Sequence, residues 1–208
     1  MKGGCVAVQS HYFTDNTSLP SDRKEHSFRF SGHVYTFVTD EGVFSKSGVD
    51  YGTQVLLKAI QNESLQGDVL DLGCGYGVLS VVTADLFPGC TVTACDINPR
   101  AVELTAENAA RSGAAVHAVL SDGFAEITGT FDAVLTNPPI RAGKAVIYKM
   151  FEDSYAHLKD GGILLAVIRR KQGAESAVRK FEEVFGNCEV VLRDKGYWVL
   201  RSVRNLTD

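Results

Sequence analysis

Several signals of function are scarce or absent in this sequence of 208 residues. Its five cysteines include no Cys-x-x-Cys pair and its five histidines no His-Glu-x-x-His run, which argues against a zinc site or a disulfide framework. No apolar run approaches the ~18 residues of a membrane span. The apolar stretch CVAV near the start is too short for a secretory signal. These absences predict a cytoplasmic protein with reduced thiols, no metal site and no membrane contact.

Charge is unevenly distributed along the chain. Residues 1–140 carry 8 basic and 16 acidic residues, whereas residues 141–208 carry 13 basic and 9 acidic residues. A basic face on an acidic protein with a net charge of −4 is one reading of this asymmetry. A mixed, solvated surface is the other.

Hydrophobic periodicity predicts an α/β fold that follows a small β-hairpin. Apolar residues alternate on both sides of Ser31-Gly32, as in a hairpin, whereas the polar first 20 residues are typical of a partly disordered start. From Gly67 onward strands alternate with helices, which is typical of a parallel sheet covered on both faces. We expect strands at 68–72, 91–95, 115–120, 131–135, 162–168, 189–194 and 197–203, and helices at 53–62, 76–87, 98–113, 144–158 and 173–185.

Capping and turn residues define the boundaries of one predicted helix and the direction of the last predicted strand more closely. Asn98 before Pro99 predicts a helix start, and Gly113 predicts the end of the same helix. The last two strands are joined only by residues 194–196, a turn short enough for a hairpin. We therefore expect the final strand to run antiparallel to its neighbour.

The run DLGCGYG stands between a predicted strand and a predicted helix. Gly73, Gly75 and Gly77 let a ligand approach the backbone closely, although a plain tight turn would look the same. The spacing is not that of the dinucleotide fingerprint. Asp71 would repel a phosphate and suits a ligand with a positive amino group. A nicotinamide dehydrogenase is therefore disfavoured.

Two further acids follow the next two predicted strands. Asp96 is placed to accept hydrogen bonds from ribose hydroxyls, or else serves as a helix-start carboxylate. Asp122 could accept the exocyclic amine of an adenine, or else belongs to a turn before Gly123. Because parallel strands end at one edge of a sheet, the acids together favour a cationic nucleoside ligand.

The run TNPPI follows the fourth strand of the α/β region. Neither Pro138 nor Pro139 can donate to a sheet ladder, and both restrict the backbone beside Asn137. A bare turn at a strand end is one explanation. A rigid support for the asparagine is the other.

Taken together, these motifs resemble those of class I S-adenosylmethionine-dependent methyltransferases. The resemblance rests on VLDLGCGYGVLS, ACDINPRAVELTAENA, SDGF and FDAVLTNPPI, and covers about residues 40–203. The runs GVFSKSGVDYGTQVLL and VIRRKQGAES are similar, more narrowly, to those of bacterial small-subunit (16S) ribosomal RNA guanine-N2 methyltransferases in a compact, single-domain form. The resemblance implies a Rossmann-like, seven-stranded, mostly parallel sheet with an antiparallel last strand. It also implies an N-terminal extension over residues 1–45 and a methyltransferase domain over residues 46–208.

The resemblance also implies site roles, with S-adenosyl-L-methionine as cofactor. Cofactor contacts are expected from Asp71, Gly73, Cys74, Gly75, Asp96, Ile97, Asp122, Gly123, Phe124 and Asn137. The run Asn137-Pro138-Pro139-Ile140 becomes the catalytic loop. Its asparagine oxygen and the first proline carbonyl would each accept one hydrogen of an exocyclic amine, directing the nitrogen lone pair toward the methyl group.

Substrate contacts are less sharply defined. Ile140 offers no aromatic face, which disfavours DNA adenine and protein glutamine targets, and Phe44 or Phe37 could supply a stacking surface or belong to the core. Phosphate contacts, or simply a solvated charged face, are expected at Arg141, Lys144, Arg169, Arg170 and Lys171. The expected partner is ribosomal RNA or the small ribosomal subunit; the sequence leaves the oligomeric state open and a monomer is favoured. A protein amide, DNA or small-molecule methyltransferase and a non-catalytic assembly module are the alternatives.

Overall fold

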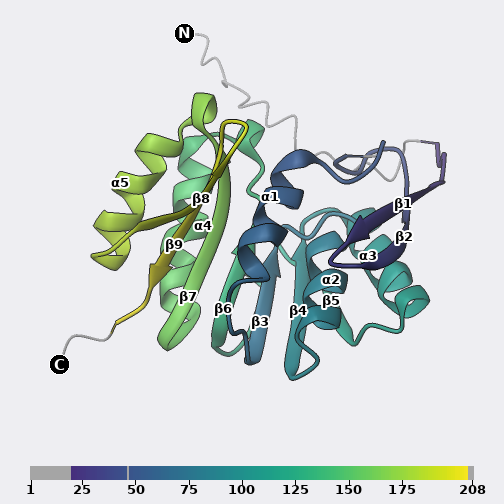
Figure 1. Cartoon of the computed structure of the whole chain (residues 1–208), viewed down its shortest axis with the longest axis horizontal. Helices are drawn as coiled ribbons and strands as arrows, with labels where there is room; N and C mark the ends of the chain where they lie inside the picture. The colour runs from purple at the N-terminus through teal and green to yellow at the C-terminus, as the bar shows by residue number, and fades with distance from the viewer. Residues whose placement is uncertain (1–19, 46, 206–208) are drawn as a thin grey trace, which may run out of the picture.

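Seven strands form one mixed sheet in the order β5-β4-β3-β6-β7-β9-β8, and two earlier strands form a separate hairpin (Figure 1). The computed structural model describes residues 20–45 and 47–205. The strands are β1 (Lys24–Phe30), β2 (His33–Thr39), β3 (Gly67–Leu72), β4 (Cys90–Asp96), β5 (Val116–Leu120), β6 (Phe131–Thr136), β7 (Leu158–Arg169), β8 (Glu189–Asp194) and β9 (Tyr197–Val203). The helices are α1 (Tyr51–Ile60), α2 (Val78–Leu86), α3 (Pro99–Ser112), α4 (Lys144–His157) and α5 (Ala174–Phe185), with short 3-10 turns η2 (Ile140–Ala142) and η3 (Arg170–Gln172).

The sheet confirms the predicted Rossmann-like fold. Strands β3 to β7 pair in parallel, whereas β9 lies antiparallel between β7 and β8. The turn between β8 and β9 holds Lys195 and Gly196 at positive φ, the conformation of a two-residue hairpin. The predicted antiparallel last strand is therefore confirmed.

Each face of the sheet has its own hydrophobic core. One core joins the sheet to α1, α2, α3 and the hairpin, and the other joins it to α4 and α5. Alternate residues of β3 supply the two cores, with Val69 on the first side and Leu70 on the second. The expected helices on both faces are thus present, and the ends of the parallel strands remain free to form a site.

The hairpin β1–β2 is anchored to the first helical layer by one buried amide. Asn108 on α3 accepts from the Val38 backbone N–H at 2.8 Å and donates to the Val38 carbonyl at 2.9 Å. Phe37 is fully buried beside Tyr76. The proposed boundary at residue 45 stays a prediction, and most of the polar start lies outside the described residues.

One boundary differs clearly from its prediction. Strand β7 begins at Leu158 rather than at residue 162, so α4 ends at His157. Leu158 pairs with Phe131, and the ladder shifts register before Ala133 pairs with Ile163. The sequence LKDGG is typical of a turn, and it becomes a strand through pairing with residues distant in the sequence, Phe131 and Arg204.

Candidate functional site

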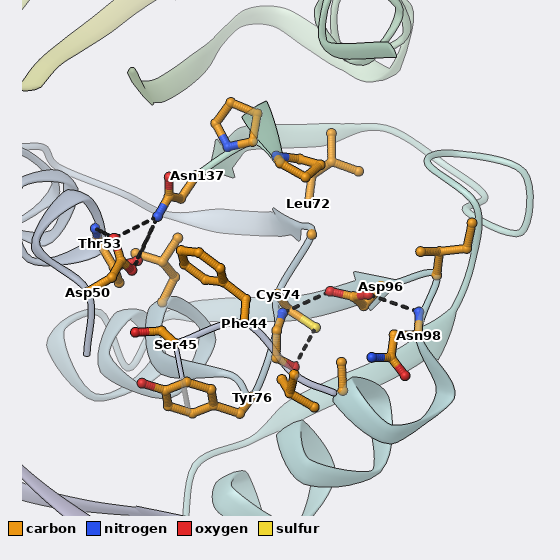
Figure 2. A pocket seen from close by; sticks show the side chains of 18 of the residues that line it. Phe44, Ser45, Asp50, Thr53, Leu72, Cys74, Tyr76, Asp96, Asn98 and Asn137 are labelled. Carbon is orange, nitrogen blue, oxygen red and sulfur yellow. Dashed lines mark hydrogen bonds between the residues drawn. The ribbon is translucent and has the colours of Figure 1, made fainter. Parts of the chain in front are cut away.

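A cavity of about 780 Å³ opens at the carboxyl ends of β3, β4 and β6 (Figure 2). Its size lies within the range of roughly 300–1,000 Å³ that is usual for small-molecule sites. Residues 41–45, Ser47 and Asp50, which lie between the hairpin and α1, form another wall together with Thr53 in the first turn of α1. The strand ends singled out in the sequence therefore converge on one pocket.

Most of the predicted site residues line this pocket. They are Phe44, Gly73, Cys74, Gly75, Asp96, Ile97, Asp122, Gly123, Asn137, Pro138, Pro139, Ile140, Arg141 and Arg169. Their shared location is a finding, whereas their individual roles stay predictions.

Two predicted cofactor residues do not line the pocket. Asp71 is fully buried and accepts a hydrogen bond from the Ser80 hydroxyl of α2. Burial raises the pKa of the Asp71 carboxyl to about 7. Phe124 is also buried and stacks on His157 with ring centroids 4.4 Å apart. Both residues are therefore buried next to chain neighbours that line the pocket, Leu72 and Gly123.

The two candidate stacking residues, Phe37 and Phe44, differ clearly in their exposure. Phe37 is fully buried, so the structure supports its core alternative. Phe44 lines the pocket with 57% of its surface exposed. Of these two candidates, Phe44 is therefore the one placed to stack on a ligand.

The predicted basic residues also divide into two groups. Arg141 and Arg169 line the pocket, whereas Lys144, Arg170 and Lys171 are exposed outside its wall. Lys144 stands 4.9 Å from the centre of the Tyr148 ring, and Arg170 pairs with Glu175 at 3.2 Å. Contact of these three residues with phosphates stays a prediction.

The glycine-rich turn is built to face a ligand. The backbone N–H groups of Gly73 and Cys74 both donate to the Cys95 carbonyl at 2.9 Å, which fixes the turn above β4. Gly73 and Gly75 have φ of 79° and 58°, and a Cβ atom added at either would meet nothing within 4 Å. Both glycines therefore leave the backbone open to the cavity.

Gly77 has a different purpose in the same turn. Its φ is 90°, and an added Cβ would lie 3.0 Å from the Thr105 side chain. Glycine here lets the start of α2 pack closely against α3. This packing holds the glycine-rich turn close to α3.

Asp96 ties the first two strand ends together. Its carboxylate accepts from the N–H groups of Gly75 and Asn98, each at 2.9 Å. Burial raises the pKa of Asp96, while these backbone donors oppose the rise. Each carboxylate oxygen can still accept a further bond, as binding of a ribose diol requires.

The catalytic-loop candidate Asn137 is held by the start of α1. Its side-chain Nδ2 donates to Thr53 Oγ1 at 3.0 Å and lies 3.2 Å and 3.3 Å from the two Asp50 oxygens (Figure 2). Asp50 also caps α1 by accepting from the Thr53 N–H. Asp50 and Thr53 therefore both take part in the start of α1 and belong to the site.

Two acceptors of this loop are left open. Among the described residues, no hydrogen bond reaches Asn137 Oδ1 or the Pro138 carbonyl oxygen. The chain around them is fixed, because Thr136 donates to the Leu72 carbonyl at 2.8 Å and Pro139 accepts from Ala142 at 2.8 Å. The loop thus presents two fixed, unused oxygen acceptors at the pocket.

Sequence reasoning did not assign several residues that line the pocket. They are Tyr76, Val146, Met150, Gln172 and Tyr197. The aromatic residue within the glycine-rich turn is a usable signal for Tyr76. The other four residues belong to parts of the chain distant from the predicted motifs, and no local sequence pattern indicates that they line the pocket.

The pocket favours a positively charged ligand. It contains the carboxylates of Glu41, Asp50, Asp96 and Asp122, against two arginines. The open glycine-rich turn and the acceptors of Asp96 fit the amino acid and ribose parts of S-adenosyl-L-methionine, whose sulfonium is cationic. In the described part of the chain, no group of three or more histidine, cysteine or acidic side chains could hold a metal ion.

This fold and this site define a class I S-adenosylmethionine-dependent methyltransferase. The glycine-rich turn follows the first strand of the α/β region, an acid ends the second, another acid follows the third, and Asn-Pro-Pro-Ile follows the fourth. The chain belongs to the methyltransferase small domain family, whose model matches residues 34–201.

Three known proteins place the chain within this family. "Uncharacterized protein YbxB" of Bacillus subtilis (strain 168) is 42% identical over 198 residues, which cover 94% of this chain and 98% of that protein. "Ribosomal RNA small subunit methyltransferase C" of Cronobacter sakazakii is 34% identical over 172 residues, or 81% of this chain and 49% of that protein. A solved structure of the T. thermophilus 16S rRNA N2 G1207 methyltransferase (RsmC), in complex with AdoMet and guanosine, matches with a TM-score of 0.81 and 30% identity.

The structural match covers 90% of this chain and 52% of the T. thermophilus protein. The chain therefore spans about half the length of these RsmC proteins, and nearly the full length of the Bacillus protein. The family and the complex with AdoMet support S-adenosyl-L-methionine as the cofactor of this chain. Among the described residues, no helix is both long and apolar enough to cross a membrane.

Proposed function

We propose that this chain methylates the exocyclic N2 amine of a guanine in 16S ribosomal RNA. The observation that carries the proposal is the pair of open acceptors, Asn137 Oδ1 and the Pro138 carbonyl, at the edge of the cofactor pocket. The names of the RsmC relatives support RNA as the substrate.

An exocyclic amine is a weak nucleophile because its lone pair is delocalised into the ring. Asn137 Oδ1 and the Pro138 carbonyl each accept one amine hydrogen, which favours a geometry with the lone pair localised on nitrogen. Since Asp50 and Thr53 already hold the Asn137 amide, little reorganisation is needed. No side chain has to remove a proton before attack, because the methylated nitrogen is acidic and loses its proton afterwards.

Cofactor and target occupy adjoining parts of the pocket in this proposal. Asp96 would hold the ribose hydroxyls, Ile97 and Asp122 the adenine, and the Gly73–Gly75 turn the methionine part. When bound, S-adenosyl-L-methionine supplies an electrophilic methyl group. Phe44 and Ile140 line the same cavity and would contact the faces of the target base.

Transfer of labelled methyl to unmodified small ribosomal subunits tests the proposal. Naked ribosomal RNA, genomic DNA and a release factor serve as parallel substrates, and Asn137→Ala serves as the inactive control. We expect label in the RNA, at a guanine N2, that is lost in the variant. Label found only in protein or DNA, or in none of the four substrates, would contradict the proposed substrate.

A further inference from the structure

The tip of the β8–β9 hairpin carries a dense group of aromatic and basic side chains. We define this hairpin-tip patch as Tyr51, Arg169, Arg193, Lys195, Tyr197 and Trp198. The tip lies beside the start of α1, at the pocket end of the sheet (Figure 1). The basic side chains of this tip contrast with the first 140 residues of the chain, which carry 16 acidic and 8 basic residues.

Each cation of the hairpin-tip patch stands against a ring. Lys195 Nζ is 4.9 Å from the centre of the Tyr51 ring, and the Arg193 guanidinium is 4.6 Å from the Trp198 ring. The Arg169 guanidinium lies 5.7 Å from the Tyr197 ring. These distances are within the range of cation–π attraction, which restrains flexible side chains without neutralising their charge.

The charges of the patch remain available to a ligand. In the part of the chain that the structure describes, no carboxylate forms a salt bridge with Arg169, Arg193 or Lys195. The acid at the tip, Asp194, is instead engaged by Lys58 at 2.9 Å and by the Tyr51 hydroxyl at 2.9 Å. Asp194 is therefore already engaged by other partners.

The patch is continuous with the cofactor pocket. Arg169 and Tyr197 line the pocket and pair across β7 and β9, whereas Arg193 pairs with Trp198 across β8 and β9. A Cβ added to Gly52 would lie 3.1 Å from the Tyr197 ring, so glycine in the first turn of α1 lets this ring pack close. An anionic strand leaving the pocket would meet Arg169 first and then the tip.

We propose that the hairpin-tip patch binds the phosphates of the RNA segment next to the target nucleotide. This inference rests on the proposed function, since it assigns the substrate backbone to a surface beside the same site. Arrayed cations suit phosphates spaced along a strand, and the aromatic rings hold the cations in position.

Binding of a fluorescein-labelled, unstructured oligoribonucleotide of about 12 nucleotides to the full chain tests the inference by anisotropy. The test variant is Arg193→Gln/Lys195→Gln. The matched control is Arg29→Gln/Arg179→Gln, which removes two exposed charges from β1 and α5. We expect about tenfold weaker RNA binding in the test variant, with a salt dependence reduced by about 1.4 in log–log slope, or about 0.7 per phosphate contact. The control should bind like the wild type.

A second pair of variants tests the role of the rings. Tyr51→Phe keeps the ring beneath Lys195 and should retain RNA binding, whereas Tyr51→Leu removes the ring and should weaken it several-fold. Equal binding by these two variants would overturn the role of the aromatic rings. The thermal midpoint of each variant shows whether it is folded.

The possible failures are distinguishable. If the wild type binds RNA and methylates it, but the test and control variants bind alike, the patch is not the contact surface and this inference fails alone. If the test variant loses RNA affinity while no RNA is methylated, the patch stands and the proposed function fails. If the wild type binds no RNA, both fail. Calorimetry with S-adenosyl-L-methionine confirms in each case that the pocket is intact.

Discussion

The side-chain nitrogen of Asn137 lies 3.0 Å from the Thr53 hydroxyl and 3.2 Å and 3.3 Å from the two Asp50 carboxylate oxygens. A carboxylate can only accept hydrogen bonds, so the amide nitrogen must face it. The Asn137 oxygen is thereby turned away from α1 and left for another donor. A helix cap thus also sets the orientation of the proposed catalytic amide.

Asn137→Ala should lower the turnover number by about 10²–10³, the usual cost of removing one preorganised group that acts in the transition state. Affinity for S-adenosyl-L-methionine should barely change, because the proposed bonds are made to the amine. Single-turnover kinetics and calorimetry measure the two quantities. Turnover close to that of the wild type would remove Asn137 from the mechanism.

Asp50→Ser should separate the two roles of Asp50. Serine still caps α1, so the free energy of unfolding should change by less than about 0.5 kcal/mol, whereas Asp50→Ala should cost about 1 kcal/mol. Both variants lose the carboxylate that orients Asn137, and turnover should fall by about 10- to 100-fold in each. Denaturation and kinetics on the same samples check this. Full activity in Asp50→Ser would mean that Thr53 alone orients the amide.

Asp96→Ala should weaken binding of S-adenosyl-L-methionine by about 10- to 100-fold, through lost charge-assisted bonds to the ribose. Asp96→Asn retains one acceptor oxygen and should lose less. Because Asp96 also accepts from Gly75 and Asn98, the alanine variant should loosen the glycine-rich turn as well. Calorimetric titration gives the dissociation constants. Identical constants for wild type and Asp96→Ala would reject the assignment.

Phe44→Leu should raise the KM for RNA by about tenfold, since stacking of a base on an aromatic ring contributes roughly 1–3 kcal/mol. Phe44→Tyr keeps the ring and should behave like the wild type. Val34→Ala, which trims a side chain 56% exposed on the distant hairpin, is the control. If Phe44→Leu and Phe44→Tyr gave the same KM, the ring would not stack on the target.

Asp71 should make stability fall as pH rises. Burial raises its pKa from 3.8 to about 7, so between these values the native state binds more protons than the unfolded state. Its contribution to the free energy of unfolding is fully present below about pH 3.8 and is lost as pH rises through about 7. The wild type should therefore lose stability relative to Asp71→Asn between about pH 4.5 and about pH 8.

Urea denaturation of both proteins across this range measures the difference. Glu126→Gln, which removes an exposed carboxylate, controls for the change in net charge. A constant difference between wild type and Asp71→Asn at every pH would show that Asp71 has the same pKa in both states.

Local chemistry allowed some elements to be predicted to the residue. The structure confirms Asn98 as N-cap of α3, Pro99 at its first position and Gly113 as its left-handed C-cap. These signals act within one turn of the chain. The start of β7 could not be predicted in this way, because Leu158 becomes a strand residue only by pairing with Phe131.

The same contrast applies to the site. Residues at or just after the ends of parallel strands, such as Gly73, Asp96 and Asn137, were expected to converge, and they line one pocket. Asp71 is different because alternate residues of a strand face opposite sides, so it shares the face of Val69 and points to Ser80 on α2. The entry of Tyr197 into the pocket depends on the position of β9, which no local pattern reveals.

The position of β9 also has a consequence for how the chain folds during its synthesis. Strand β8 is synthesised first, yet its strand partner in the sheet is β9, which lies between it and β7. A nascent chain that ends before Tyr197 therefore has an open edge on β7, an unpaired β8 and an incomplete pocket wall. Synthesis of β9 closes the sheet and completes the pocket wall in a single event, so we expect the growing chain to gain its binding function only after this strand has been made.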